Sequence, residues 1–354
     1  MATPDKNDLQ DQAGPAESDG PDGMAEDSLT GLLFETSPYG NMDAIVQHDD
    51  QSVYFYLHGD ESFGTRACWV RNLAEAPYVL DKDVMQHGLP PMMPRTHSKS
   101  PDAGEVPKPE SLRIVWFEEG NAAALFEHQE LIAVIPPWSG TDGFHGYSAQ
   151  CVMESPLAWP LVDHEQLTRR IGNAQLFWEA CGSEAGHPFA ELQPRLLEAF
   201  DQQFGERVKY FALDGGAFPP RGAAIYRQES ATVVVSVGMS FRPQPNVEMA
   251  VESPAELRRI ELGLELPGKL SEEELTPFLE QISGLVAYPW QAQTWFGPGH
   301  TCRFPAYQKT HGEQFDTASF VAERTRSENP LTLPDFRDDP VELLWLMPVK
   351  SPPT

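Results

Sequence analysis

Two segments in the last third of the chain place the strongest constraint on its fold. "TVVVSVGMSF" (232–241) is continuously apolar at its start, which is typical of a strand covered on both faces. "RIELGLEL" (259–266) alternates instead, with aliphatic residues on one face and Glu261, Gly263 and Glu265 on the other. This second pattern predicts a half-buried strand with one solvated face. Both segments predict a sheet against which other elements pack.

Further strands and two amphipathic helices are predicted around these segments. Strands are expected at 208–214, 223–226 and 343–349. Apolar residues recur at helical spacing in two places, namely Leu167, Ile171, Ala174 and Phe177, and then Leu192, Leu196, Phe200 and Phe204. Gly205 follows the second stripe, as expected just past a helix C-terminus. Both helices need a sheet, or each other, to cover their apolar faces.

A third helix carries its apolar stripe over residues 275–286, and two signals compete for its start. Ser271 with Glu274 fits a capping box, whereas Thr276 before Pro277 fits an N-cap followed by a first-turn proline. A proline six residues into a helix loses a hydrogen bond. We therefore predict the later start.

The first half of the ordered chain is predicted to be rich in β-strands. Short runs of aromatic and branched residues, separated by Gly, Asp and Asn turn signals, lie at 53–58, 67–70, 112–118, 123–128 and 131–137. "EEGN" (118–121) is expected to form a hairpin loop between two of them. The proline-rich segment 90–110 is expected to be a long surface loop.

These patterns predict an α+β fold with largely antiparallel or mixed sheets, a few packed amphipathic helices and two β-rich lobes. Residues 1–28 hold eight acidic residues against one lysine and no aromatic residue, so we expect an acidic, disordered tail. The N-terminal lobe is expected over 29–160. An α/β domain is expected over 161–354.

The formal net charge of −28 narrows the range of partners. Such a surface repels nucleic acid and anionic membranes, and it favours encounter with a basic protein or peptide. The four cysteines, at 68, 151, 181 and 302, show no CxxC spacing, which suits a reducing cytoplasm. No signal peptide and no run of about 20 apolar residues is present, so we expect a cytoplasmic protein.

The sequence holds no phosphate-loop, dinucleotide-binding, zinc-protease or nucleophile-elbow motif. His300 and Cys302 lie in "TWFGPGHTC" (294–302), which we interpret as a strand, "QTWF", turning through three residues into a second strand. The two side chains would share a face, but zinc needs a third protein ligand, and neither His145 nor His311 is placed nearby by the sequence. Turn and core roles are favoured, and no metal or cofactor is expected. Glu118 and Glu119 are interpreted as part of an acidic hairpin loop rather than as a catalytic pair.

Three segments supply candidate partner-binding residues. The loop 136–151 mixes aromatic residues with glycines and a histidine, which favours either recognition or plugging of the end of the β-layer. "FRPQPNVE" (241–248) is expected to project Arg242, Asn246 and Glu248 into solvent, with Arg242 as a local charge partner rather than an anion receptor. The candidates are Trp138, Phe144, His145, Tyr147, Arg242, Asn246, Trp295 and His300.

The segment 206–349 resembles a suppressor-of-fused domain, of the bacterial type. The resemblance is carried by an ordered set: an apolar strand running into "GMS" (238–240), "ELGLEL" (261–266), an amphipathic helix, "WQAQTW" (290–295), a glycine-containing turn with a histidine, and "LLWLMPV" (343–349). The family's order and spacing are matched here as a whole.

The resemblance implies a non-catalytic α/β module that binds a protein or an extended peptide, and bacterial relatives suggest an immunity protein that neutralises its partner. An extended peptide added to an open sheet edge is the simplest mode of binding. The alternative from the residues is a hydrolase or metalloenzyme that uses His300 and His145 with a carboxylate.

Overall fold

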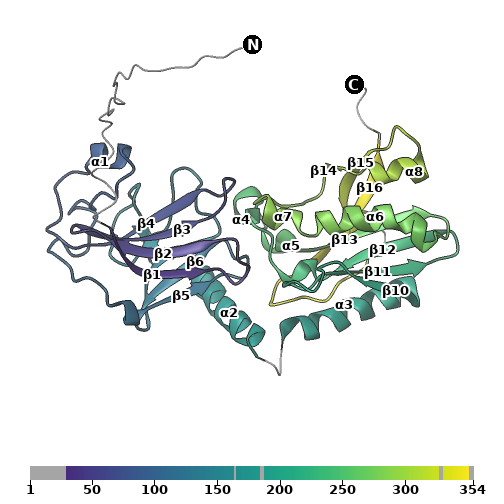
Figure 1. Ribbon diagram of the computed structural model, residues 1–354, viewed down its shortest axis with the longest axis horizontal. Helices are drawn as coiled ribbons and strands as arrows, with labels where there is room; N and C mark the ends of the chain where they lie inside the picture. The colour runs from purple at the N-terminus through teal and green to yellow at the C-terminus, as the bar shows by residue number, and fades with distance from the viewer. Residues whose placement is uncertain (1–28, 163–164, 184–186, 327–329, 351–354) are drawn as a thin grey trace, which may run out of the picture.

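The computed structural model describes residues 29–162, 165–183, 187–326 and 330–350, which form two lobes side by side (Figure 1). The N-terminal lobe holds a four-stranded and a five-stranded sheet, and the C-terminal lobe holds a seven-stranded sheet with helices on it. The predicted α+β class with mostly antiparallel sheets is confirmed. No helix among the described residues is long and apolar enough to cross a lipid bilayer.

The two sheets of the N-terminal lobe share one core. The first sheet is antiparallel and runs β1 (Thr30–Thr36), β2 (Asp43–His48), β3 (Ser52–His58) and β4 (Thr65–Asn72) in sequence order. The second runs β5 (Leu112–Trp116), β6 (Ala123–Glu127), β7 (Glu130–Ile135), β8 (Tyr147–Ser148) and β9 (Trp159–Pro160). Phe55 and Trp69 from one sheet pack with Leu125 and Ile135 from the other, so the sheets bury each other's inner faces.

The five predicted strands of this lobe are confirmed, and the "EEGN" hairpin joins β5 to β6. The sequence did not indicate β1 and β2, because β1 is an exposed edge strand without a continuous apolar run. The proline-rich segment is a long connection that contains an isolated bridge from Ser98 to Cys151 and, near its end, the short helix η1 (Pro109–Ser111). A short helix, α1 (Lys82–Gln86), precedes it.

Helices α2 (Glu165–Cys181) and α3 (Pro188–Phe204) follow the predicted stripes. Leu167, Ile171 and Ala174 of α2 pack in the N-terminal lobe, whereas Phe177 enters the core of the C-terminal lobe. The two helices lie beneath different lobes, α2 under β5 and α3 under the seven-stranded sheet (Figure 1). Gly205 caps α3 with a φ of 88°, as its position predicted.

The seven-stranded sheet is covered on both faces, with α3 on one and α6 (Glu272–Leu285) on the other. Its strand order is β10-β11-β12-β13-β16-β15-β14, and only β13 and β16 are parallel. The strands are β10 (Arg207–Ala212), β11 (Gly222–Arg227), β12 (Ala231–Val237), β13 (Arg259–Pro267), β14 (Thr301–Arg303), β15 (Thr317–Ala322) and β16 (Val341–Val349). Every residue of β12 is buried, as its apolar run predicted.

Short helices fill the connections of this lobe. The four-residue helices are α4 (Val247–Ala250), α5 (Ala255–Arg258), α7 (Tyr288–Gln291), α8 (Gln308–His311) and α9 (Glu323–Arg326). Two three-residue turns of helix accompany them, η2 (Met239–Phe241) and η3 (Pro305–Tyr307). Of these, η2, α4 and α5 lie between β12 and β13 and carry the chain to the junction of the lobes.

The predicted solvated face of β13 is wrong. Glu261 and Gly263 are buried, and only Glu265 on that face is exposed. The ring of Trp345, on neighbouring β16, lies across Gly263, where a Cβ atom would stand 2.8 Å from its Cε3. An alternating pattern does not reveal a tryptophan on the adjacent strand, so the polar half of the pattern was misread as solvated.

The Glu261 carboxylate is buried because the turn after β12 folds around it. One oxygen accepts the main-chain N–H groups of Gly238 (2.9 Å) and Ser240 (3.0 Å) and the Ser240 hydroxyl (2.6 Å). The other accepts the Ser236 hydroxyl and the N–H of Met239 (3.3 Å). Burial raises the pKa of Glu261, against the effect of these donors. The carboxylate thus sets the conformation of the "GMS" turn.

The predicted start of α6 is also wrong. The helix begins at Glu272 with the complete capping box of Ser271 and Glu274, and Pro277 lies inside it. The acceptor that Pro277 leaves unused is the carbonyl of Glu273, an exposed residue whose carbonyl water can satisfy. The capping box satisfies two main-chain donors at once, which outweighs the loss.

The strand predicted at "QTWF" is wrong as well. Residues 288–291 form α7, residues 294–297 are irregular, and β14 begins only at Thr301. Phe296 is held in place because its N–H donates to the side-chain oxygen of Gln244 (2.9 Å) and its ring stacks on Phe320, 4.6 Å away between centroids. This long-range anchor is not visible in local residue patterns.

We predict that Glu261→Gln destabilises the protein by about 2–3 kcal/mol, because the amide nitrogen must face donors in place of an acceptor. The measurement is urea unfolding followed by circular dichroism. Glu265→Gln, four residues along the same strand and exposed, is the matched control and should change the free energy of unfolding by less than about 1 kcal/mol. Equal effects of the two variants would contradict this account of the turn.

Candidate functional site

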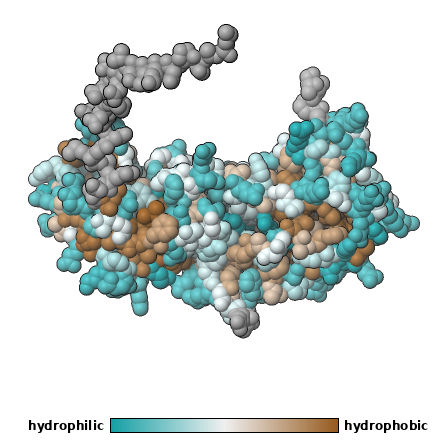
Figure 2. Space-filling view, viewed as in Figure 1, coloured by the Kyte–Doolittle hydropathy of each residue, from teal (hydrophilic) through white to brown (hydrophobic). Residues whose placement is uncertain are grey.

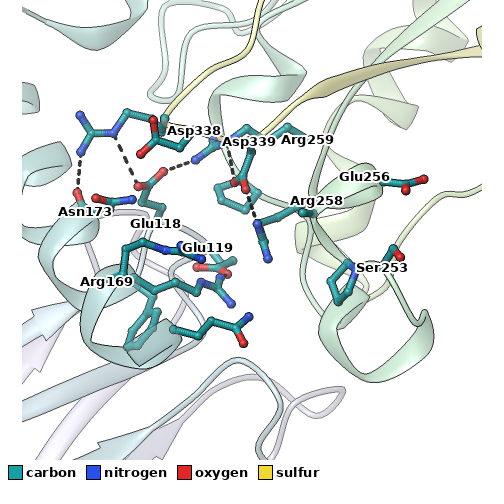
Figure 3. Close-up of a pocket in the computed structure, with 17 residues that line it drawn as sticks. Glu118, Glu119, Arg169, Asn173, Ser253, Glu256, Arg258, Arg259, Asp338 and Asp339 are labelled. Carbon is teal, nitrogen blue, oxygen red and sulfur yellow. Dashed lines mark hydrogen bonds and ion pairs between the residues drawn. The ribbon is translucent and has the colours of Figure 1, made fainter. Parts of the chain in front are cut away.

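A cavity of about 600 Å³ lies at the junction of the two lobes (Figure 3). Its walls come from the β5–β6 hairpin, from α2, from the connection before β13 and from the segment before β16. The hairpin contributes Phe117, Glu118 and Glu119. On the exposed surface, apolar patches on each lobe flank a more hydrophilic zone between them (Figure 2). The cavity is therefore a polar feature of the lobe junction.

The cavity differs in charge from the molecule as a whole. Five arginines and five carboxylates line it, so their formal charges cancel within a protein of net charge −28. The residues are Arg169, Arg170, Arg258, Arg259, Arg337, Glu118, Glu119, Glu256, Asp338 and Asp339. Among the 25 lysines and arginines of the chain, one fifth thus gather at this junction.

Arg259 joins the two lobes. Its guanidinium, 1% exposed, pairs with Glu118 of the hairpin and with Asp339 (3.2 Å). It also donates to the main-chain oxygens of Ser240 (3.1 Å) and Phe241 (2.9 Å). The charge is compensated by two carboxylates and two carbonyls, which is the arrangement that makes a buried ion pair tolerable.

A second chain of ion pairs runs beside the first. Arg170 of α2 pairs with Glu119 and with Glu248 (2.7 Å), and Glu248 also accepts from Arg258 Nε (2.9 Å). Arg258 in turn pairs with Asp339. The Oε2 atom of Glu119 is buried and accepts no hydrogen bond from any residue that the structure describes. The cavity thus contains one buried carboxylate oxygen without a donor.

The hairpin predicted at Glu118 and Glu119 is present. Both of its acidic side chains are buried and ion-paired. Fold-level packing against the second lobe buries them, which the local pattern does not reveal. One signal was available: "RR" occurs at 169–170 and again at 258–259, in a chain with 25 basic against 53 acidic residues. Paired arginines in so acidic a chain indicate buried carboxylate partners.

The aromatic loop 136–151 is packed inside the N-terminal lobe. Phe144 and Tyr147 are buried, with ring centroids 4.8 Å apart, and Trp138 Nε1 donates to the Tyr147 hydroxyl (3.2 Å). His145 Nδ1 accepts the main-chain N–H of Ala67 (3.2 Å), and burial lowers the pKa of this histidine. These contacts agree with the interpretation in which the aromatic rings of the loop close the end of the β-layer. One contact of the loop reaches the other lobe, from the Thr141 hydroxyl to Met249 Sδ (2.6 Å) on α4.

The expectation that Arg242, Asn246 and Glu248 project into solvent is wrong. Arg242 is buried and donates through Nε (2.8 Å) and Nη2 (2.6 Å) to the main-chain oxygen of Glu119. Asn246 is partly buried and donates to the main-chain oxygen of Gln293. The connection that seemed polar and exposed in the sequence is covered by the hairpin of the other lobe.

Trp295 and His300 lie together in the C-terminal lobe, with ring centroids 4.4 Å apart. His145 lies in the other lobe, so the histidines of the alternative enzyme reading are not brought into one site. Across the described residues, no group of three or more His, Cys, Asp and Glu side chains is arranged to hold a metal ion.

Residues 219–352 match the family model described as suppressor of fused protein (SUFU). This match shows a suppressor-of-fused-like domain within the C-terminal lobe. The match includes Arg258, Arg259 and Asp339, but it leaves the hairpin and α2 outside. No curated protein matches the chain.

We predict that Arg259→Ala destabilises the protein by about 3–5 kcal/mol, because it leaves Glu118 buried with its main partner removed. Arg324→Ala is the control, since its pair with Glu256 is exposed and should be worth about 0–1 kcal/mol. Urea unfolding measures both. An Arg259→Ala variant as stable as the Arg324→Ala variant would show that the buried pair does not hold the lobes together.

Proposed function

We propose that this protein is a non-catalytic, cytoplasmic protein-binding module and that a basic partner binds at the cavity between its lobes. The observation that carries the proposal is the Oε2 atom of Glu119, a buried carboxylate oxygen on the cavity wall that no described residue donates to. A lysine or arginine side chain from a partner would supply the missing donor. The suppressor-of-fused-like domain supports a protein as the partner.

The energetics favour such an occupant. A buried polar atom without a hydrogen bond costs about 1–3 kcal/mol, and a donor from a partner would recover this cost on binding. The net charge of −28 would accelerate encounter with a basic protein and repel an acidic one. Charge steers the approach, and the cavity then selects a cationic side chain.

An extended segment of the partner is the form that we propose. β1 is an edge strand of the four-stranded sheet, and Phe34 on it is 64% exposed. A peptide strand added to such an edge gains main-chain hydrogen bonds, while its side chains reach apolar surface. We include binding that neutralises the partner, as in an immunity protein of the bacterial type, within this proposal.

The alternative is a hydrolase or metalloenzyme that uses His145 and His300. The separation of these residues between the lobes weighs against it, because a shared substrate or metal must contact both. Elemental analysis of the protein purified without chelators separates the two functions. A stoichiometric transition metal would favour the enzyme.

We predict that Glu119→Gln weakens capture of a basic partner from native lysate by about tenfold or more, and that wild-type capture falls steeply as salt rises. Quantitative mass spectrometry measures the amount of partner bound by the wild-type protein and by each variant. Glu61→Gln removes the same charge from an exposed acid that does not line this cavity, and it should leave capture unchanged. Equal capture by the two variants, at matched stability, would contradict the proposed site.

A further inference from the structure

A second cavity, of about 350 Å³, lies at the lobe junction next to the hairpin and is lined largely by aromatic and basic side chains. Its lining residues are Tyr39, Asn41, Asp60, Phe218, Pro219, Arg221, Arg242, Ala287, Trp290 and Gln291. The first three come from the N-terminal lobe and the others from the C-terminal lobe, so this cavity too exists only when the lobes are joined.

Arg242 is the central side chain of this cavity. It is 6% exposed, and its guanidinium lies 3.6 Å from the ring centroid of Tyr39 and 5.3 Å from that of Trp290. Its only hydrogen bonds to described residues go to one acceptor, the main-chain oxygen of Glu119, and they use Nε and Nη2. Nη1 therefore has no acceptor in the described part of the chain. A buried guanidinium normally has a carboxylate partner, and this one has a carbonyl.

Arg221 adds a second cation to the same wall. Its Nε is buried without a hydrogen-bond partner among the described residues, and it forms no ion pair with any of them. Asp214 accepts the main-chain N–H of Arg221 (2.7 Å), and its charge partly offsets the lowering of the Arg221 pKa by burial. Burial lowers the pKa of Arg242 to about 9, and the nearby charge of Arg221 contributes to this lowering. Both effects are those of buried cations that lie close together.

The one carboxylate in the lining does not fill this role. Asp60 uses Oδ1 to accept from the Ser62 hydroxyl (2.6 Å) and from the main-chain N–H groups of Ser62 (3.0 Å) and Phe63 (3.2 Å). It forms no ion pair with Arg221 or Arg242. The carboxylates of Glu118 and Glu119 are already paired with Arg259 and Arg170 in the first cavity. Neither guanidinium of the cation pair thus forms an ion pair with a carboxylate of the described residues.

We propose that this second cavity binds a carboxylate group, held by the free Nη1 of Arg242 and by Arg221. Planar guanidinium groups match the geometry of a carboxylate, and the aromatic rings of Tyr39 and Trp290 fix the orientation of Arg242. A monoanion is favoured over a phosphate dianion because the net charge of −28 opposes each added negative charge. This site is independent of the proposed function, since a free carboxylate suffices to occupy it.

The test uses the full-length protein and follows the indole N–H resonance of Trp290, which donates to the main-chain oxygen of Pro243 (2.7 Å) at the cavity wall. Trp290→Phe assigns the resonance. Acetate is titrated against acetamide, its neutral isostere, at constant ionic strength. Saturable shifts with acetate alone are expected. The absence of a saturable shift with acetate, or an equal response to acetamide, overturns the proposal.

Variants locate the site. Arg221→Gln is expected to weaken acetate binding about tenfold or more, since charge-assisted hydrogen bonds are about twice as strong as neutral ones. Arg303→Gln, an exposed arginine on β14, should leave binding unchanged. Arg221 is chosen because it is only partly buried, and circular dichroism establishes that the variant is folded. Unchanged affinity in folded Arg221→Gln overturns the assignment.

Three further probes identify the source of the carboxylate. N-acetyl-glutamate amide presents a side-chain carboxylate and N-acetyl-alanine a C-terminal one, while inorganic phosphate tests the choice of anion. Tighter binding of either peptide mimic than of acetate indicates a protein ligand, and tighter binding of acetate indicates a small molecule. Tightest binding of either peptide mimic, or of acetate, supports the carboxylate site. Tighter binding of phosphate than of every carboxylate overturns it.

Discussion

The structure depends on one buried cation at the lobe junction. Arg259 lies at the start of β13, and its guanidinium pairs with Glu118 of the N-terminal hairpin and with Asp339. It also donates to two main-chain oxygens. Its position follows from the turn that Glu261 holds two residues later, because that turn supplies the carbonyl oxygens of Ser240 and Phe241. The sheet, the turn and the hairpin are therefore fixed together. Removal of one partner from such a buried pair is costly, because it leaves an uncompensated buried charge.

Much of the fold could be predicted, because apolar periodicity depends on near neighbours. The stripes of α2 and α3, the buried run of β12 and the hairpin between β5 and β6 all follow from residues within one element or its turn. The errors occur where burial depends on residues far away in the sequence. Glu261 is buried by a turn 21 to 23 residues earlier in the chain, Gly263 is covered by Trp345 on another strand, and "QTWF" is held by Gln244. No local pattern contains these partners.

The candidate site was harder to predict than the fold. Arg242 was identified as a site residue, yet its expected exposure was wrong because the hairpin of the other lobe covers it. Glu118 and Glu119 were interpreted as part of an acidic hairpin loop, and the local pattern did not reveal that they pair with arginines of the ion-pair cluster. Contacts between lobes join residues more than 100 positions apart, and only the paired arginines hinted at them.

The hairpin turn has a consequence for how the two cavities behave together. Gly120, with a φ of 73°, approaches so closely that a Cβ atom would stand 2.4 Å from the Tyr39 ring and 3.1 Å from Nη2 of Arg242. One peptide segment therefore presents the Glu119 carboxylate to the first cavity and its carbonyl to the second. A ligand in one cavity that displaces this segment alters the affinity of the other cavity for its own ligand. Thermodynamic linkage makes the effect reciprocal. The hairpin turn is therefore the structural element common to both proposed ligand sites.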